Sequence, residues 1–404
     1  MPAGFPIDRV RADFPWLVEH AAGRIAADNA ATSLKPRAVI EAVRGYLGEY
    51  AGNVHRGHHG LSERASSAYE ASRHAVARWL GARRAEIVFV RGTTEAINLV
   101  AAGLGLAPDD AVIATTLEHH SNLLPWSARA RLRLAPLDRE GLPDLAAAEA
   151  MIDARTRLIA VTACSNVTGV RVPVRAWADM AHRHGLPVLV DAAQALAHER
   201  LDVTSLDCDF LAASGHKALA PTGAGVLYGK REALERLSPL LYGGGAVGEV
   251  ASDGSFELRE VPWRFEAGTP DIAAAIGLGA AIEYLDELGM DAIGEHEATL
   301  CAALDRSIAT IPELEVVVIG AGLARAPLLS LRPREASMRA EVLARLLADS
   351  FGVLTRAGHH CAHPLHAALG LGSTLRISLS LYNTVDEVER IAEALTKALR
   401  RRPS

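Results

Sequence analysis

An acidic residue and a lysine each follow a short apolar run near the middle of the chain. Residues 187–190 lead into Asp191, and residues 210–213 lead into Ser214-Gly215-His216-Lys217. A lysine amine can form a Schiff base with the aldehyde of pyridoxal phosphate (PLP). A carboxylate beside the pyridine nitrogen keeps that nitrogen protonated, so that the ring can accept electrons from a substrate Cα. Taken alone, the pair is equally compatible with a surface lysine and a helix-capping aspartate.

A second segment could bind the phosphate of such a cofactor. Residues 91–95 (RGTTE) follow the apolar run 87–90 and open a helical stretch. Small hydroxyl side chains and free N–H groups at the start of a helix bind phosphate. Ser214 and His216 could add contacts, and His119, after the next apolar run, could stack on a flat ring. Each histidine could equally be an ordinary polar loop residue.

Cys361 lies in a run of Gly, His and Pro, residues 356–365, which predicts a loop. Nearby imidazoles could lower the pKa of the thiol, and the thiolate is the nucleophilic form. The alternative is a metal site, because several potential ligands cluster here: His359, His360, Cys361, His363 and His366. We expect no metal, since clustering in sequence does not by itself give tetrahedral geometry and no second ligand group is evident.

Arg356 and Arg376 are candidates for binding the carboxylate of an amino acid. A guanidinium group binds a carboxylate through two parallel hydrogen bonds. Either arginine could instead form a surface ion pair.

The elements that must position these residues alternate between β and α patterns. Strands are predicted at residues 87–90, 112–116, 132–137, 158–163, 188–190, 210–213 and 225–228. Helices are predicted between them, at residues 63–80, 94–103, 122–131 and 174–184. This alternation predicts an α/β fold with a mostly parallel, seven-stranded sheet covered by helices on both faces. Such sheets bind ligands beyond the carboxyl ends of their strands.

After about residue 270 the pattern changes to that of a smaller α+β domain. Helices are predicted at residues 273–288, 292–310, 338–350 and 385–400, and strands at residues 315–319, 328–331, 352–355 and 375–380. We therefore expect a large cofactor-binding domain at residues 23–270. Residues 1–22 and 271–404 would form a small domain that carries the Cys361 loop.

Composition excludes several classes of protein. The 404 residues include 42 basic and 48 acidic side chains, with no basic stripe of the kind that binds nucleic acid. No run approaches the ~18 apolar residues of a membrane span, and residues 1–11 lack the apolar core of a secretory signal. The cysteines form no CxxC pair and no disulfide framework: Cys164, Cys208, Cys301 and Cys361. We expect a cytoplasmic protein with free thiols that binds neither nucleic acid nor membrane.

Many short segments, in order along the chain, resemble the class V aminotransferase family and, within it, the SUF-type (group II) cysteine desulfurases. They span residues 10–397 and read DNAATS (28–33), NVHRG (53–57), RGTTEAIN (91–98), EHHSN (118–122), SNV (165–167), VDAAQA (190–195), SGHK (214–217), PTG (221–223), RFEAGTP (264–270), RAGHHC (356–361) and YNT (382–384).

The resemblance implies a fold-type I PLP enzyme that works as a homodimer. Lys217 would hold the cofactor, Asp191 would pair with its pyridine nitrogen, Gln194 would reach its ring hydroxyl, and His119 would stack on its ring and help to move protons. The phosphate would be bound by Thr93, Thr94, Ser214 and His216, joined by Thr269 of the neighbouring subunit. Asn166 and Arg376 would bind the substrate carboxylate, and Arg356 would lie near the nucleophile.

The implied reaction converts L-cysteine to L-alanine and leaves a persulfide on Cys361. A small acceptor protein would take this sulfur for iron–sulfur cluster assembly or another sulfur-containing product. His58, Gly60, His363 and residues 375–378 (LRIS) depart from the usual family pattern, so a selenocysteine lyase, a cysteine sulfinate desulfinase or a related PLP lyase or epimerase is the alternative. A further alternative is a binding or scaffold protein that has lost catalysis. The presence of all four residues expected for the reaction argues against this alternative: Lys217, Asp191, His119 and Cys361.

Overall fold

The computed structural model describes residues 5–317, 322–335 and 337–400. Its centre is a seven-stranded sheet in the order β2-β8-β7-β6-β5-β3-β4. The strands are β2 (Ile87–Val90), β3 (Ala111–Thr115), β4 (Arg131–Ala135), β5 (Thr156–Thr162), β6 (Val188–Asp191), β7 (Phe210–Ser214) and β8 (Gly225–Gly229). Six of these strands run in one direction and β8 runs opposite to them, so the predicted mostly parallel α/β sheet is confirmed.

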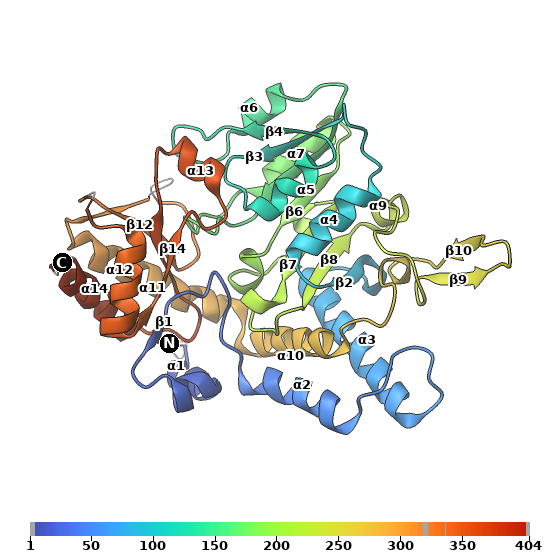
Figure 1. The fold of residues 1–404 in the computed structure, drawn as a ribbon, viewed down its shortest axis with the longest axis horizontal. Helices are drawn as coiled ribbons and strands as arrows, with labels where there is room; N and C mark the ends of the chain where they lie inside the picture. Colours follow the sequence, from blue (N-terminus) through green and yellow to red (C-terminus); the bar gives the residue numbers. More distant parts are fainter. Residues whose placement is uncertain (1–4, 318–321, 336, 401–404) are drawn as a thin grey trace.

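Both faces of this sheet are buried, as expected for strands with continuous apolar runs. Val188 and Val190 of β6 belong to one hydrophobic cluster, whereas Leu189, between them, belongs to the cluster on the opposite face. Helices cover both faces (Figure 1). They are α2 (Arg37–Glu49), α3 (Gly60–Leu80), α4 (Thr93–Gly103), α5 (Leu124–Ser127), α6 (Leu145–Ala150), α7 (Val174–Arg183), α8 (Val203–Leu206), α9 (Arg231–Glu235) and α10 (Ile272–Leu288).

A second, smaller sheet has a separate hydrophobic core. Its antiparallel strands follow the order β11 (Leu314–Val316), β12 (Leu328–Pro333), β15 (Thr374–Ser378), β14 (Arg356–Gly358). The core includes Leu300, Leu347 and Leu395, from α11 (Met290–Ala309), α12 (Ala340–Phe351) and α14 (Val385–Arg400). The remaining elements are α1 (Ile7–Ala12), α13 (His363–Ala368) and the parallel pair β1 (Ile25–Ala26) and β13 (Val353–Leu354).

The predicted domain division at residue 270 stays a prediction. α10 lies just beyond it and packs against α2 and α3, which precede it. By contrast, α11 and α14 pack against each other around the second core. α10 also contacts α11, so it connects the helices around the large sheet with those around the second core.

The local predictions differ from the structure at several points. The predicted helix at residues 122–131 is instead a short turn at His120–Asn122, the single-turn helix α5 and the start of β4, because Pro125 lies in the first turn of α5 and Arg131 already pairs with Ala111 of β3. The hairpin of β9 (Val247–Val250) and β10 (Phe256–Leu258), which projects from the molecule in Figure 1, was not predicted. Strand β14 was assigned to a loop, and part of the predicted strand 315–319 lies outside the described residues.

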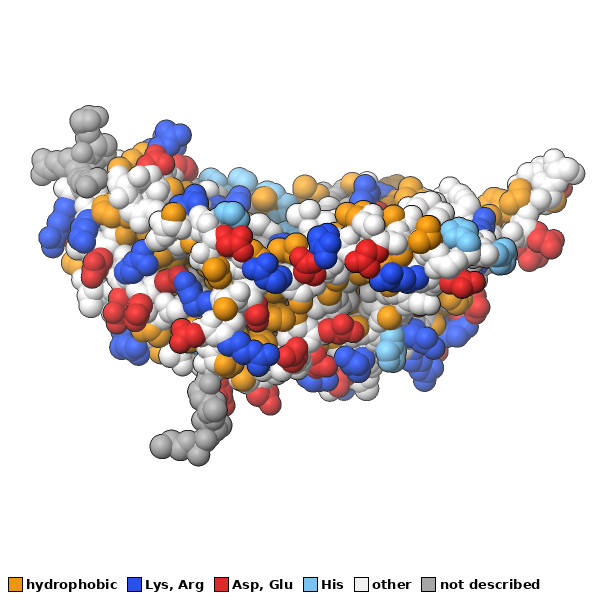
Figure 2. All heavy atoms as spheres, turned by 90° about the horizontal axis from the view of Figure 1, so that it is seen from below, with side chains coloured by type: hydrophobic (Ala, Val, Ile, Leu, Met, Phe, Trp, Pro, Cys, Tyr) orange, Lys and Arg blue, Asp and Glu red, His pale blue; other side chains and the backbone are white. Residues whose placement is uncertain are grey.

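Charges of both signs are mixed over the face seen in Figure 2, with apolar side chains scattered among them. This agrees with the nearly balanced composition of 42 basic and 48 acidic residues. Among the described residues, no helix combines the length and apolar character needed to cross a bilayer.

Candidate active site

The carboxyl ends of the large sheet's strands meet the loop that carries Cys361 at a cavity of about 350 Å³. The cavity brings together every residue of the predicted site except Thr269: Thr93, Thr94, His119, Asn166, Asp191, Gln194, Ser214, His216, Lys217, Arg356, Cys361 and Arg376. Asp191 and Ser214 are the last residues of β6 and β7, and Lys217 ends the short turn that follows Ser214. The expected ligand edge of the parallel sheet is therefore where these groups converge.

Asp191 is buried, Lys217 is partly buried, and the two side chains interact electrostatically. Burial lowers the pKa of Lys217 from 10.5 to about 8, although the carboxylate of Asp191 opposes this shift. Burial raises the pKa of Asp191, which the backbone N–H of Ala193, at 2.9 Å, opposes by donating to its carboxylate. A lysine amine with a pKa near 8 is free much more often at neutral pH than an exposed lysine, as a carbonyl-reactive amine requires.

The start of α4 provides donors suited to a phosphate. The helix begins after Gly92, which has no side chain that could cap the first N–H groups. The backbone N–H of Thr93 donates to Ser214 Oγ at 2.8 Å, and the two hydroxyls also lie 2.8 Å apart. A Cβ at Gly225 would lie 2.4 Å from Gly92 Cα, so glycine at position 225 lets this loop approach β8.

His119 is held as a neutral ring beside the cavity. Its Nδ1 accepts a hydrogen bond from the backbone N–H of Ser121 at 3.0 Å, which leaves the ring proton on Nε2. Burial, with the positive charge of Lys217 as a smaller cause, lowers the pKa of His119 to about 4. A neutral ring can lie flat against a cofactor without placing a second cation beside Lys217.

Glu118 holds the segment around His119 in place through buried hydrogen bonds, a role that was not predicted. Its carboxylate accepts hydrogen bonds from Thr115 Oγ1 at 2.6 Å, Asn122 Nδ2 at 2.7 Å and the backbone N–H of Thr162 at 2.9 Å. Burial raises the pKa of Glu118 to about 8 against the effect of these donors. The carboxyl group thus ties the His119 segment to both β3 and β5.

The Cys361 loop has an unusual backbone. His360 and Cys361 both lie in the left-handed region, with φ of 49° and 56°. Such a conformation costs a non-glycine residue roughly 1–3 kcal/mol, so surrounding contacts must hold it. Asn166 Nδ2 donates to the carbonyl of His360 at 2.7 Å, and the N–H of His120 donates to the carbonyl of Cys361 at 2.8 Å. Cys361 alone among the four cysteines is classed as exposed.

Asp28 binds both candidate arginines and was not predicted as a site residue. Arg356 and Arg376 are opposite each other on β14 and β15. Arg356 contacts the Asp28 carboxylate at 3.0–3.1 Å, and Arg376 contacts it at 3.2 Å. Arg376 is 3% exposed and also donates to the carbonyl of Asn166 at 2.9 Å. Asp28 holds both guanidinium groups beside the cavity; its only signal in the sequence was the segment DNAATS.

Thr269 lies in a different place. It lines a second cavity of about 220 Å³ together with Asn53, His55 and Arg56, and Asn53 Nδ2 lies 3.4 Å from its hydroxyl. The predicted role of Thr269 toward a neighbouring subunit stays a prediction.

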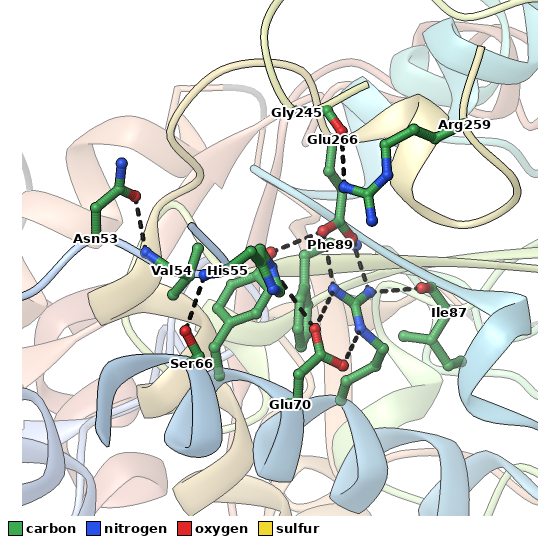
Figure 3. Close-up of polar contacts among 12 residues, drawn as sticks. Asn53, Val54, His55, Ser66, Glu70, Ile87, Phe89, Gly245, Arg259 and Glu266 are labelled. Atoms are coloured by element: carbon green, nitrogen blue, oxygen red, sulfur yellow. Dashed lines mark hydrogen bonds and ion pairs between the residues drawn. The ribbon is translucent and has the colours of Figure 1, made fainter. Parts of the chain in front are cut away.

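A buried ion pair supports this second cavity (Figure 3). Arg73 contacts the two oxygens of Glu266 at 2.7 and 2.8 Å, and its side chain is 1% exposed against 5% for Glu266. Glu266 also accepts hydrogen bonds from Tyr69 Oη at 2.9 Å and from the N–H of Phe89 at 2.8 Å. The network joins α3 and β2 to the segment that leads to Thr269.

Glu266→Ala should lower the free energy of unfolding by about 3–5 kcal/mol, because it leaves the Arg73 charge buried without its main partner. Chemical denaturation of the purified variant measures the change. Glu287→Ala is the control, since Glu287 and Arg9 pair at 3.0 Å on the surface, and it should cost less than about 1 kcal/mol. Equal losses in the two variants would contradict the importance assigned to the buried pair.

The histidines near Cys361 bind one another. His120 Nε2 lies 3.1 Å from His363 Nδ1, and the ring of His359 stacks on that of His363 with centroids 4.4 Å apart. Within residues 5–317, 322–335 and 337–400, no three His, Cys, Asp or Glu side chains are grouped so that they could hold a metal ion.

Known proteins share both this sequence and this fold. The Aminotransferase class-V family model matches residues 25–391. A cysteine desulfurase of Dickeya dadantii is 45% identical, over 97% of this chain and 96% of that protein, and a probable cysteine desulfurase of Halalkalibacterium halodurans is 43% identical, over 95% and 96%. The structure of the cysteine desulfurase CsdA (S-sulfonic acid) of Escherichia coli superposes with a TM-score of 0.90 at 39% identity, covering 98% of this chain and 99% of that one. The apo structure of a cysteine desulfurase from Thermococcus onnurineus NA1 superposes with a TM-score of 0.91 at 38% identity, with the same coverage of both chains. The chain belongs to the cysteine desulfurases of the class V aminotransferase family.

Proposed function

We propose that the cavity between the two sheets binds pyridoxal phosphate through Lys217 and removes sulfur from L-cysteine with Cys361 as the nucleophile. The donor set fits this cofactor: the partly buried Lys217 for its aldehyde, Asp191 for its pyridine nitrogen, Gln194 for its ring hydroxyl, and the start of α4 for its phosphate. When bound, the cofactor accepts electrons from the substrate Cα and so activates the substrate for cleavage.

Lys217 is proposed to carry the proton that leaves the substrate Cα. Its amine has a pKa lowered to about 8 by burial, which suits a base that works near neutral pH. His119, neutral and protonated on Nε2, lies in the same cavity and can donate a hydrogen bond without adding charge. Arg376 and Asn166 would hold the substrate carboxylate, with Arg356 close to the nucleophile.

Cys361 is proposed to accept the sulfur atom. Its thiolate attacks the substrate sulfur, the new S–S bond forms, and the C–S bond breaks with its electron pair passing to the substrate Cβ. Protonation of Cβ then yields the methyl group of alanine, and the persulfide stays on Cys361. The exposed position of Cys361 supports transfer of this sulfur to a small acceptor protein, for iron–sulfur cluster assembly or another sulfur-containing product.

The working form is proposed to be a cytoplasmic homodimer. The projecting segment around β9 and β10 exposes large apolar side chains, Leu241, Tyr242, Val250 and Phe256, which a second copy could cover. Thr269, Asn53 and Arg56 line the second cavity, where they are available to a neighbouring subunit.

The observation that carries the proposal is the single cavity in which Lys217, Asp191 and the exposed Cys361 meet. The test is a substrate panel of L-cysteine, L-selenocysteine and L-cysteine sulfinate, with alanine measured with and without a thiol reductant. Reductant should raise turnover of cysteine, because it removes the persulfide from Cys361. If alanine formed from selenocysteine or cysteine sulfinate but not from cysteine, the desulfurase proposal would be wrong, and the chain would be a selenocysteine lyase or a cysteine sulfinate desulfinase.

A further inference from the structure

The hydroxyl of Thr374 lies beneath the loop that carries Cys361. Thr374 is the first residue of β15 and is fully buried. Because alternate residues of a strand share a face, Thr374 lies on the same face as Arg376. Its Oγ1 lies 3.0 Å from His360 Nε2, 3.2 Å from His366 Nε2 and 3.4 Å from the carbonyl oxygen of Gly358.

The directions of these hydrogen bonds follow from the carbonyl oxygen of Ala362. His366 Nδ1 lies 3.0 Å from the carbonyl oxygen of Ala362, which can only accept, so the ring proton of His366 is on Nδ1. Nε2 of the neutral ring then accepts, and its partner Thr374 must donate its single proton. Thr374 can therefore only accept from His360, which places the proton of His360 on Nε2. Turning the hydroxyl to the more distant Gly358 would leave His366 Nε2 buried without a donor.

Both rings are buried and neutral, as this chain of bonds requires. His360 is 8% exposed and His366 is 1% exposed. Burial lowers the pKa of His360 to about 3, helped by the charge of Arg376, and burial also lowers the pKa of His366. A proton added to His366 Nε2 would remove the acceptor of the Thr374 hydroxyl, which could then donate only to the more distant carbonyl of Gly358.

The hydrogen bonds of Thr374 and His366 hold the strained part of the loop at two points. His360 is the first of the two left-handed residues, and the carbonyl that fixes His366 belongs to Ala362, directly after Cys361. Thr374 thus connects the residues on either side of the thiol to the strand that also carries Arg376. Loss of the hydroxyl would release His360 on one side and His366 on the other.

We propose that Thr374 and His366 are positioning residues for the nucleophile: they fix the ring of His360 and thereby the left-handed backbone that presents Cys361 to the cavity. Neither residue lines the cavity. The role rests on the desulfurase reaction proposed above, because only a reaction that uses the Cys361 thiol needs this loop to be placed accurately.

Thr374→Val tests the proposal in the cofactor-loaded protein, since it keeps the shape of the side chain and removes its hydrogen bonds. A nucleophile displaced by about 1 Å can lose about 100-fold in rate, so kcat for alanine formation from cysteine should fall about 10- to 100-fold. KM should stay within about twofold, because the groups that bind the substrate carboxylate are unchanged. Turnover of cysteine sulfinate, which can leave without a thiol nucleophile, should stay near the wild-type rate.

Two controls separate this role from general stability. Thr374→Ser keeps the hydroxyl and should restore kcat. Thr355→Val is the matched control, because Thr355 is also a threonine near the site, directly before Arg356. Its buried hydroxyl has no hydrogen-bond partner in the described structure, so removing this hydroxyl should leave both activities unchanged. An equal loss toward cysteine and sulfinate, or wild-type kcat in Thr374→Val, would overturn the proposal.

A measurement on the wild-type protein does not depend on how the variants fold. In protein with 15N-labelled histidine, NMR spectra of the ring nitrogens should show the proton of His366 on Nδ1 and that of His360 on Nε2. The opposite assignment for either ring would overturn the inferred bond directions. A wild-type protein that forms no alanine from cysteine would instead contradict the proposed function and leave this tautomer pattern standing.

Discussion

Lys217→Ala is expected to abolish both the yellow colour of the purified protein and its turnover of cysteine. In the proposed function the absorbance comes from the cofactor linked to the lysine nitrogen, and alanine offers no such nitrogen. Turnover should fall by at least about 10⁴-fold, the upper range for a single positioned proton-transfer group, because Lys217 is also the proposed anchor of the cofactor. Absorbance spectra before and after adding PLP, together with alanine assays, measure both effects.

Two matched variants test whether the effect requires an amine that can lose its proton and whether it is specific to position 217. Lys217→Arg keeps a positive charge, but a guanidinium group stays protonated at neutral pH, so this variant should also be colourless and inactive. Lys35→Gln should keep the visible absorbance. The Lys35 pKa is also lowered to about 8 by burial, but its amine donates to the carbonyl oxygens of Ser33 and His216, and Lys35 does not line the cavity. Wild-type absorbance in Lys217→Ala would exclude Lys217 as the anchor.

The lowered pKa of Lys217 also predicts how cofactor uptake depends on pH. Only the free amine attacks an aldehyde, and with a pKa of about 8 roughly a tenth of the amine is free at pH 7. An ordinary lysine, with a pKa near 10.4, would have roughly 200-fold less free amine at pH 7. The rate at which apo-protein regains absorbance should rise about tenfold per pH unit below pH 8 and level off above it. A rate still rising steeply beyond pH 10 would contradict a buried, perturbed amine.

The cofactor side of the site could be predicted because it follows the sheet. Asp191, Ser214 and Lys217 stand directly after apolar runs, and parallel strands bring their carboxyl ends to one edge. The same rule explains why Thr93 and His119 join them, since α4 and the His119 segment follow β2 and β3.

The remaining parts of the site depend on pairings that leave no periodic signal. Asp28 precedes Arg356 by 328 residues and Arg376 by 348, and it meets them because β1 pairs with β13 and β14 pairs with β15. β14 is three residues long and contains glycine, so nothing in its pattern indicated a strand. Thr374 and His366 are separated by only eight residues, yet their contact depends on the loop geometry at His360. The predicted helix at residues 122–131 failed for a local reason, because a single turn containing Pro125 has to reach β4 by Arg131.

Cys361→Ser should keep the visible absorbance and lose sulfur transfer from cysteine. Serine preserves the shape of the loop, but its hydroxyl is ionised far less than a thiol at neutral pH and is a much weaker nucleophile toward sulfur. Alanine and sulfide formation from cysteine should therefore fall by at least about 10³-fold. Alkylation of the wild-type protein, followed by peptide mass spectrometry, should label Cys361 before the other three cysteines, because only Cys361 is exposed.

Two comparisons make the serine result specific to sulfur transfer. Cys301→Ser should retain wild-type rates, because Cys301 is partly buried, does not line the cavity and has a pKa raised to about 11 by burial. Cysteine sulfinate should still be converted by Cys361→Ser, since its leaving group needs no thiolate to remove it. If cysteine is also converted at the wild-type rate, sulfur leaves without Cys361, and the strained loop at residues 360–361 must serve another purpose. If both substrates lose turnover equally while the absorbance persists, Cys361 acts before the two reactions diverge, as a proton donor or as a substrate contact, rather than as the sulfur acceptor.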